Sequence, residues 1–443
     1  MRSTVHHARS KNQYKELHLE LIIVLISVIL LVLLGAQLFL VIGGISLLLF
    51  FLYLDIPMFY VVKTMFDTVN NPMLLAIPLY VFAGAIMARG EIAKRLIELA
   101  EASLGWLKGG LAVASVLACI LFAAISGSSP VTLIAIGTIM YPALIKNGYK
   151  ESVALGVLTV SGSLGILIPP SIPMIVFSIV TRTDIDKLFI AGIIPGAVTG
   201  IILMGLCIYF GYRDNIPTNK FSSNEFGRAL WRGIPALIMP ILILGGIYSG
   251  IYTVTEAGAV AAVYAILVEF LVFRRMKVKD LMDTLYESVL ILGIIFIIIV
   301  MATVFNRFLT LQDVPFMLVD FMQETVTSQG MFLLFTLLLL IVVGLFMDVI
   351  SAILIIAPLL VPTAIAYDVD LIHLGIIFIL GLEVGYVTPP IGINLFVASG
   401  IFNKPFTKVA SASIPYLICL LIALVLITYI PAISLYLTEF VGR

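Results

Sequence analysis

Long apolar runs cover most of this chain, and their lengths limit the folds open to it. A membrane helix needs about 20 apolar residues. Runs of this kind lie at residues 19–34, 38–55, 72–88, 112–142, 153–178, 190–212, 233–250, 256–273, 288–305, 331–362, 374–400 and 410–436. Hydrophobic residues make up 62% of the chain, more than a soluble fold can remove from water. We therefore predict an all-α polytopic membrane protein. Nucleic-acid binding is not expected, because 25 basic residues are balanced by 25 acidic ones.

Two of the runs are too long for one crossing and are interrupted by polar residues. Run 112–142 is broken by Ser126-Gly127-Ser128-Ser129-Pro130. Each arm then holds about 13–14 residues, or about 20 Å, short of the ~30 Å membrane core. Two short arms around a polar tip predict a re-entrant helical hairpin. Run 331–362 has the same form, with its tip near Met347-Asp348.

Two further runs, 153–178 and 374–400, each contain a Pro-Pro pair, which unwinds a helix. From the first hairpin onward, a shift of 220 residues superposes the two halves of the chain without a gap. The superposed pairs are Pro142 with Pro362, Gly165 with Gly385, Pro169 with Pro389, Pro170 with Pro390, Ser128 with Asp348 and Ser163 with Glu383. The hairpins and the broken helices therefore belong to an internal repeat.

The charges of the connecting loops predict the orientation of each half. Loops 89–111, 213–232, 274–287 and 402–409 are rich in Arg and Lys, which places them in the cytoplasm by the positive-inside rule. The second hairpin is flanked by one basic residue, Arg307, and by five acidic ones: Asp313, Asp320, Glu324, Asp368 and Asp370. It should therefore enter from the opposite side, which makes the repeat an inverted one.

These observations predict four segments. They are a polar tail at 1–18, a first inverted repeat at 19–212, a cytoplasmic connector at 213–232 and a second inverted repeat at 233–443. The tail is basic, although counting spans backwards places it outside, so its sidedness and role stay open.

Inverted repeats with broken helices in matching positions are typical of secondary transporters whose site lies near the membrane midplane. Serine hydroxyls and freed backbone carbonyls are oxygen ligands suited to a cation such as Na⁺. In the first half we expect the hairpin tip and the broken helix to meet and enclose one cation. The candidate ligands there are Ser126, Gly127, Ser128, Ser129, Ser161, Gly162, Ser163 and Gly165. The alternative is that Ser129 and Pro130 only start the second helical arm.

In the second half the candidate Na⁺ ligands are Asp348, Glu383, Gly385 and Thr388. An ionisable group inside a membrane costs at least a few kcal/mol, which favours a functional role. The alternatives are that Asp348 caps the second hairpin arm and that Glu383 lies in a polar interface. A capping role is expected for Glu256, and an ion pair with Arg274 and Arg275 for Glu269.

Few basic residues fall in the membrane core, so an anionic substrate would be held by the positive ends of half-helices and by hydroxyl donors. The candidate substrate residues are Ser128, Ser129, Pro170, Ser171, Pro390 and Asn394. Residues 91–107 have charges on one face and predict either an amphipathic helix at the membrane surface or a plain connector. Cys119, Cys207 and Cys419 match no metal or redox spacing and are expected to be small core residues.

Seven segments carry a resemblance to a known family: 77–84 (IPLYVFAG), 124–130 (AISGSSP), 161–173 (SGSLGILIPPSIP), 191–196 (AGIIPG), 253–257 (TVTEA), 344–348 (GLFMD) and 388–394 (TPPIGIN). Together they resemble the large membrane subunit, of DctM type, of tripartite ATP-independent periplasmic (TRAP) transporters. The likeness covers nearly the whole chain after residue 19.

The resemblance implies a multi-pass protein of the bacterial inner membrane, with an elevator-type fold of the ion-transporter superfamily. It implies Na⁺-coupled import of a small organic acid anion. It also implies two partners, a separate four-helix small membrane subunit and a periplasmic substrate-binding protein. C4-dicarboxylates are the first substrate expected, with sialic acid, other sugar acids and sulfonates open.

Two other functions stay open on sequence grounds. One is a one-component Na⁺/anion symporter of the same superfamily. The other is a membrane-embedded enzyme, although the chain has only four histidines and no H-E-x-x-H, G-x-S-x-G or G-K-[ST] motif. The lack of an ATPase motif favours an ion gradient as the driving force.

Overall fold

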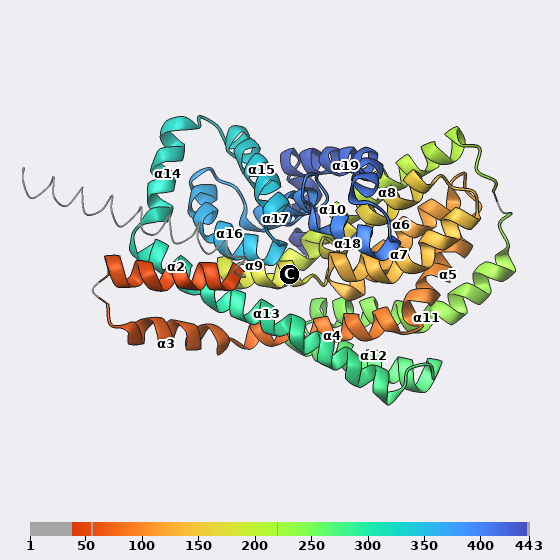
Figure 1. Cartoon of the computed structure of the whole chain (residues 1–443), viewed down its shortest axis with the longest axis horizontal. Helices are drawn as coiled ribbons and strands as arrows, with labels where there is room; N and C mark the ends of the chain where they lie inside the picture. Colours follow the sequence, from red (N-terminus) through yellow and green to blue (C-terminus); the bar gives the residue numbers. More distant parts are fainter. Residues whose placement is uncertain (1–37, 55, 219, 441–443) are drawn as a thin grey trace, which may run out of the picture. The chain divides into compact units, whose positions relative to one another are not determined.

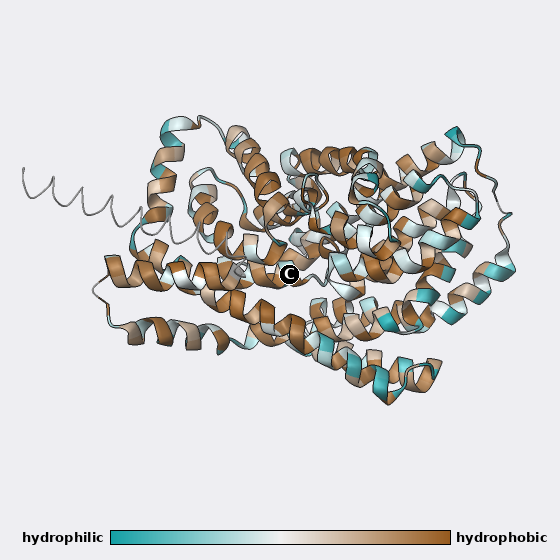
Figure 2. Ribbon diagram, in the orientation of Figure 1, coloured by the Kyte–Doolittle hydropathy of each residue, from teal (hydrophilic) through white to brown (hydrophobic). Residues whose placement is uncertain are grey.

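The computed structural model describes residues 38–440, apart from 55 and 219. The polar tail and the first apolar run, 19–34, therefore lie outside the described residues. Every regular element in the described residues is a helix. Nine helices of this part are long and apolar enough to cross a membrane. Hydrophobic residues extend along most helices, and hydrophilic ones concentrate at helix ends and loops (Figure 2). The prediction of an all-α polytopic membrane protein is confirmed.

The chain forms two compact units, and the smaller one comprises Met1–Asn71 and Gly293–Leu318. Its described part contains α2 (Leu38–Tyr53), α3 (Met58–Val69), and the portions of α13 (Val278–Leu311) and α14 (Val314–Thr325) within those bounds. Its buried core consists of Leu49, Phe50, Val61, Val304 and Phe308. The sequence pattern did not predict α3 or α14, because neither matches an apolar run of membrane length.

The larger unit comprises Pro72–Leu292 and Val319–Arg443. The elements of its first half are η1 (Pro72–Leu75), α4 (Ala76–Arg89), α5 (Ile92–Leu104), α6 (Gly110–Ser126), α7 (Ser129–Lys146), α8 (Glu151–Ser161), η2 (Gly162–Ile166), α9 (Ile172–Thr181) and α10 (Ile185–Arg213). Those that follow are α11 (Ser223–Tyr248), α12 (Val254–Leu267), η3 (Val268–Phe273), α15 (Gln329–Phe346), α16 (Val349–Ala366), α17 (Leu371–Tyr386), α18 (Ile393–Phe402), α19 (Phe406–Tyr429), α20 (Ala432–Leu435) and η4 (Tyr436–Phe440). The first residues of α11 thus fall inside the predicted connector.

Both predicted hairpins break where the sequence places their tips. The chain leaves α6 at Gly127, which has a left-handed φ of 57°, and enters α7 through the extended residue Ser128. The second hairpin breaks at Met347 and Asp348. The arms are longer than expected, with 17 residues in α6 and 18 in each of α7, α15 and α16. An 18-residue helix is about 27 Å long, so the arms exceed the predicted 20 Å but are still shorter than the ~30 Å membrane core. Re-entry of the hairpins stays a prediction.

Both Pro-Pro pairs interrupt their helices, as predicted. The first pair separates η2 from α9, and the second separates α17 from α18. Both Pro-Pro peptide bonds are cis. Ser171 bridges the first break, because its hydroxyl donates to the Ile166 carbonyl at 2.5 Å and accepts from the Met174 N–H at 3.4 Å.

Each hairpin packs against the other half of the chain. Helix α7 of the first hairpin lies against α18 of the second half, as Figure 1 shows. The second hairpin repeats the arrangement, since α16 packs against α9 of the first half. A shift of 220 residues converts one contact into the other. The two halves therefore interlock through their hairpins.

The 91–107 segment contains a helix, α5, whose apolar residues Ile92, Leu96 and Leu99 are buried. Helices α6 and α11 pack against α5. The segment is therefore a helix rather than a plain connector, and its apolar face is covered by protein; its position at the membrane surface stays a prediction. Amphipathic helices have the same pattern whether lipid or protein covers them.

Glu269 is fully buried and stabilises the start of α5 from a distant part of the chain. Its Oε2 and Oε1 accept the backbone N–H groups of Glu91 and Ile92 at 3.0 and 3.1 Å. These are donors that a helix start leaves unpaired. A Cβ on Gly90 would lie 2.0 Å from the Glu269 Cδ, so glycine is required there. The expected ion pair with Arg274 and Arg275 is therefore wrong.

Two smaller expectations are confirmed. Glu256 completes a capping box with Thr253 at the start of α12. Cys119 and Cys207 are buried, Cys419 is half-buried, and all three are free thiols.

Candidate functional site

In the first half the hairpin tip closes on the broken helix, as expected. The Gly127 carbonyl accepts the Ile172 N–H at 3.3 Å. A Cβ on Gly127 would lie 2.7 Å from the Pro170 carbonyl oxygen, and one on Gly165 would lie 2.5 Å from that of Ser128. The two backbones therefore approach so closely on both sides of the Pro-Pro pair that only glycine fits at these positions.

The first hairpin tip carries a small hydroxyl network. Ser126 Oγ and Thr132 Oγ1 are hydrogen bonded at 2.7 Å, and the Thr132 hydroxyl donates to the Ser128 carbonyl at 2.9 Å. Ser126 and Thr132 are buried. Sequence reasoning missed Thr132, although its position one turn after Ser128 on the second arm was a usable signal.

The hydroxyls of the 161–165 stretch are also buried, and their hydrogens are directed into the helix that carries them. Ser161 donates to the Val157 carbonyl at 2.6 Å, and Ser163 donates to the Val160 carbonyl at 2.5 Å. Gly162 allows the stretch to lie against α7, since a Cβ there would be 2.8 Å from the Leu133 Cβ. A serine that donates its single hydrogen retains only lone pairs, which suits a cation.

In the second half three of the predicted cation ligands, Asp348, Gly385 and Thr388, make contacts with their own or neighbouring helices. Asp348 caps α16, accepting the Ser351 N–H at 3.0 Å and also the Ser351 hydroxyl. Gly385 packs on α15, where its Cβ would lie 2.6 Å from the Ile341 carbonyl oxygen. Thr388 donates to the Val384 carbonyl at 2.5 Å. The Thr388 N–H also donates to the Gly385 carbonyl at 3.0 Å, and within the described part of the chain no hydrogen bond joins Asp348 to either residue.

Glu383 lies instead against the first hairpin. Its Oε1 accepts the Ser129 hydroxyl at 2.9 Å and the Asn394 Nδ2–H at 3.2 Å. Asn394 Nδ2 also donates to Ser129 Oγ at 2.5 Å. All three residues are 0–1% exposed. We call Ser129, Glu383 and Asn394 the inter-repeat cluster, because it joins α7 of the first half to α17 and α18 of the second.

The half-helices also differ in how their N-termini are capped. Ser171 caps α9 and Asp348 caps α16 with their side chains. In the described residues no side chain caps α7 or α18, the two helices that pack together at the inter-repeat cluster. Uncapped helix N-termini carry unpaired N–H groups and a partial positive charge, and so favour anions.

The candidate substrate residues fall into three places. Ser128, Ser129 and Asn394 lie at the uncapped ends of α7 and α18. Pro170 and Ser171 are buried in the first-half break, whereas Pro390 is exposed in the second.

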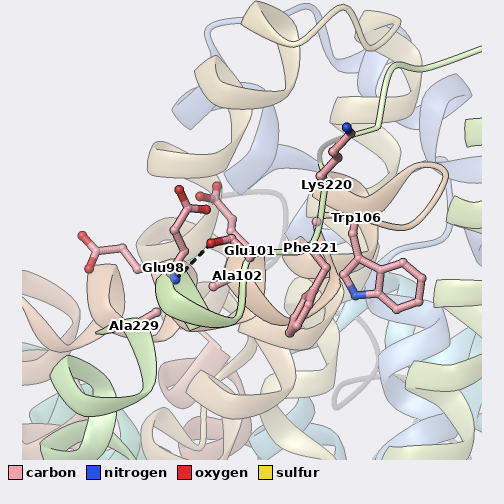
Figure 3. A pocket seen from close by; sticks show the side chains of 10 residues that line it. Glu98, Glu101, Ala102, Trp106, Lys220, Phe221 and Ala229 are labelled. Carbon is pink, nitrogen blue, oxygen red and sulfur yellow. Dashed lines mark hydrogen bonds between the residues drawn. The ribbon is translucent and has the colours of Figure 1, made fainter. Parts of the chain in front are cut away.

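Figure 3 shows a separate pocket between α5 and the segment leading into α11. Glu98, Glu101 and Glu225 line it together with Lys220 and Trp106. Burial, and secondarily the neighbouring Glu98, raises the pKa of Glu101. The pocket contains none of the candidate residues, and its excess of carboxylates disfavours an anion.

The chain is similar to known transporter subunits over most of its length. Residues 25–433 match the family described as Tripartite ATP-independent periplasmic transporter, DctM component. One relative is the C4-dicarboxylate TRAP transporter large permease protein DctM of Pseudomonas aeruginosa, 41% identical over 379 residues that cover 85% of this chain and 89% of the relative. Another is the isethionate TRAP transporter permease protein DctMQ of Oleidesulfovibrio alaskensis, 35% identical over 386 residues that cover 86% of this chain and 60% of the relative.

A solved structure supports the fold. The crystal structure of the YdaH transporter of Alcanivorax borkumensis, described as having an unusual topology, matches with a TM-score of 0.59. The match covers 94% of this chain and 98% of the other at 13% identity, so it bears on the fold alone. Relatives named as transporter permeases also indicate a transport subunit rather than an enzyme. With the family match extending over residues 25–433, the chain belongs to the DctM component family of the tripartite ATP-independent periplasmic transporters.

Proposed function

We propose that this inner-membrane subunit couples inward movement of Na⁺ to import of a small organic acid anion by an elevator mechanism. It would receive the anion from a periplasmic binding protein and work with a four-helix small membrane subunit. Among substrates we favour a C4-dicarboxylate, in line with the name of the Pseudomonas aeruginosa relative.

The observation that supports this most is the closure of the first hairpin tip on the Pro-Pro break. It gathers backbone carbonyls and buried hydroxyls of 126–129 and 161–165 inside an apolar helical unit. Irregular backbone at membrane depth is stable only where protein or a polar cavity satisfies its polar groups. We propose that a Na⁺ ion completes this arrangement. A second ion would use Asp348, Gly385 and Thr388.

For the anion we propose the uncapped N-termini of α7 and α18. These two helix ends belong to different repeats and lie together beside Ser129 and Asn394. Their combined partial charges would hold a carboxylate without a basic side chain.

Removing the Ser128 hydroxyl should raise the Na⁺ concentration needed for half-maximal uptake about tenfold, corresponding to about 1.4 kcal/mol. The test is Na⁺-driven uptake of radiolabelled succinate in liposomes that contain both membrane subunits and the chain's own binding protein. Ser128→Ala is compared with Thr138→Ala, which removes a hydroxyl from a later turn of α7. An unchanged Na⁺ dependence in Ser128→Ala would show that Ser128 serves only to begin helix α7 and does not bind Na⁺. Uptake without Na⁺ or without the binding protein would contradict the proposed coupling or the tripartite assembly.

The inverted topology predicts that Lys146 faces the cytoplasm and Asp368 the periplasm. Both side chains are exposed. Single cysteines at these positions, in a background with Cys119, Cys207 and Cys419 replaced by alanine, should react with an impermeant maleimide from opposite sides of the membrane. Labelling of both from the same side would contradict the inverted repeat.

A further inference from the structure

A second pocket of the larger unit lies where α5, α11 and η3 meet, and its volume is about 560 Å³. Helix α11 packs against both α5 and α12, and η3 continues α12 (Figure 1). The pocket is lined by two arginines and otherwise by apolar residues, which include Trp231, Pro235, Val272 and Phe273. The arginines are Arg95 and Arg232. No acidic residue is among the described residues that line it, in contrast to the pocket of Figure 3.

The pocket lies at the ends of two apolar runs of the sequence. Run 233–250 begins directly after Arg232, and run 256–273 ends at Phe273. Such runs cross the hydrocarbon core of a membrane, and tryptophan and arginine are typical of the layer in which the lipid headgroups lie. We therefore expect the pocket at the level of the headgroups, next to loops 213–232 and 274–287 on the predicted cytoplasmic side.

The two arginines of the pocket differ in their surroundings. Arg95 Nη1 donates to Glu98 Oε2 at 2.8 Å, and Arg95 Nη2 lies 3.3 Å from Glu91 Oε2. The Arg95 guanidinium also lies over the Phe273 ring, 5.8 Å from its centre. Arg232 is exposed, and no ion pair of the described residues includes it. The two glutamates balance the charge of Arg95, whereas Arg232 adds an uncompensated positive charge, which favours an anionic ligand.

An apolar surface continues from the pocket along α11. Trp231, Ile238 and Ile241 are 77%, 38% and 70% exposed. Their spacing of seven and three residues places them on one face of the helix. Ten residues of α-helix extend over about 15 Å, which is long enough to contact much of a hydrocarbon chain. A positively charged pocket at headgroup level therefore adjoins an apolar strip that points toward the membrane core.

We infer that this pocket binds an anionic phospholipid, with its phosphate at Arg232 and an acyl chain along the α11 face of Ile238 and Ile241. A soluble phosphate ion would meet the same arginine but would leave the apolar walls of the pocket, such as Pro235 and Val272, without a ligand. Helix α5 leads directly into the first hairpin, so a lipid in this pocket would hold α5 against α11 and η3. The inference goes beyond the proposed function, because it involves neither Na⁺ nor the transported anion.

The two tryptophans of the chain provide the test, because Trp231 lines this pocket and Trp106 lines the pocket of Figure 3. The purified full chain with Trp106→Phe retains Trp231 alone. It is placed in phosphatidylcholine nanodiscs in which part of the lipid is phosphatidylglycerol or phosphatidylcholine with brominated acyl chains, which quench nearby tryptophan fluorescence. Brominated phosphatidylglycerol should quench Trp231 at an about fivefold lower fraction of the lipid than brominated phosphatidylcholine, as expected for one arginine beside an anionic headgroup.

Two arginines on α11 separate the pocket from a general attraction of the surface. Arg232→Gln in the Trp106→Phe chain should remove the preference for phosphatidylglycerol. Arg228→Gln is the matched control, because Arg228 is exposed one turn earlier on α11 and does not line the pocket. This variant should retain the preference. A chain with Trp231→Phe reports on Trp106 instead, and both brominated lipids should quench Trp106 equally.

Four outcomes would overturn the inference. Equal quenching of Trp231 by the two lipids would show that it only faces the bulk bilayer. Equal losses of preference in Arg232→Gln and Arg228→Gln would show a diffuse attraction of the surface. Reversal of the quenching by inorganic phosphate, but not by sodium chloride of the same ionic strength, would assign the pocket to a soluble phosphate. Loss of the preference on adding the small membrane subunit, with its tryptophans replaced by phenylalanine, would assign the surface to that subunit.

Discussion

Replacing Gly165 by alanine is expected to destabilise the protein and to abolish most transport. The new Cβ would lie 2.5 Å from the Ser128 carbonyl oxygen and 2.6 Å from Thr132 Oγ1. The first obstacle is backbone and cannot rotate away, so the hairpin tip must move off the broken helix. Overpacking of this kind costs about 1–3 kcal/mol. The measurement is thermal unfolding of the purified chain in detergent, combined with uptake in liposomes.

The internal repeat supplies a second variant, and a surface glycine supplies the control. Gly385→Ala should also destabilise, because its Cβ would lie 2.6 Å from the Ile341 carbonyl oxygen. Gly205 is exposed on α10 and a Cβ there meets no atom within 4 Å. Gly205→Ala should therefore leave stability unchanged or raise it slightly, since alanine favours helix by about 1 kcal/mol. Wild-type stability and uptake in Gly165→Ala would show that the close approach of tip and broken helix is dispensable.

The breaks of the larger unit could be predicted because their causes are local. A Pro-Pro pair interrupts a helix whatever surrounds it, and Ser-Gly-Ser-Ser-Pro both ends one helix and begins the next. The lengths of the arms were predicted less well. Helix α7 continues to the polar residue Lys146, beyond the end of the apolar run. A hydropathy pattern does not include polar residues at the end of a helix, so it predicts a helix that is too short.

The partners of the buried carboxylates could not be predicted, because they depend on contacts between distant segments. Glu269 binds backbone N–H groups 177 and 178 residues away, and a sequence pattern does not reveal a backbone donor. Because Arg274 and Arg275 follow Glu269 closely in the sequence, an ion pair between Glu269 and these arginines was the simpler prediction. Similarly, Glu383 meets Ser129 across 254 residues, through packing between the two halves that the repeat alone does not specify.

The repeat also predicted more symmetry than the structure has. Ser128 and Asp348 are equivalent by the 220-residue shift, but the hairpins contact their broken helices at different points. A Cβ on Gly165 would meet the Ser128 carbonyl at the first tip, whereas one on Gly385 would meet Ile341 and Gly344, which precede the second tip. Pro170 is buried and Pro390 is exposed. Two similar sequences can therefore pack differently in the two halves of one chain.

Asp348→Asn is expected to fold normally and to lose Na⁺-driven uptake by more than about tenfold, corresponding to more than 1.4 kcal/mol. Asp348 caps α16 through the Ser351 N–H, and asparagine caps a helix about as well as aspartate. Folding therefore should not depend on the charge. A full charge next to a cation is worth a few kcal/mol at the effective dielectric constant of a partly buried site, so coupling should depend on it strongly.

Asp370→Asn is the matched control for this prediction. Asp370 caps α17 in the same way, with Oδ1 accepting the N–H groups of Ile372 and His373 at 2.7 and 3.2 Å, but it is not at a hairpin tip. If capping were the whole role of both residues, the two variants should behave alike and transport normally. Uptake is measured in liposomes with a saturated binding protein, and folding by thermal stability in detergent. Loss of uptake in Asp348→Asn alone would assign the charge of Asp348 to the cation. Equal, near wild-type uptake in both variants would leave Asp348 as a cap, and the second cation would then depend on Thr388 and backbone carbonyls.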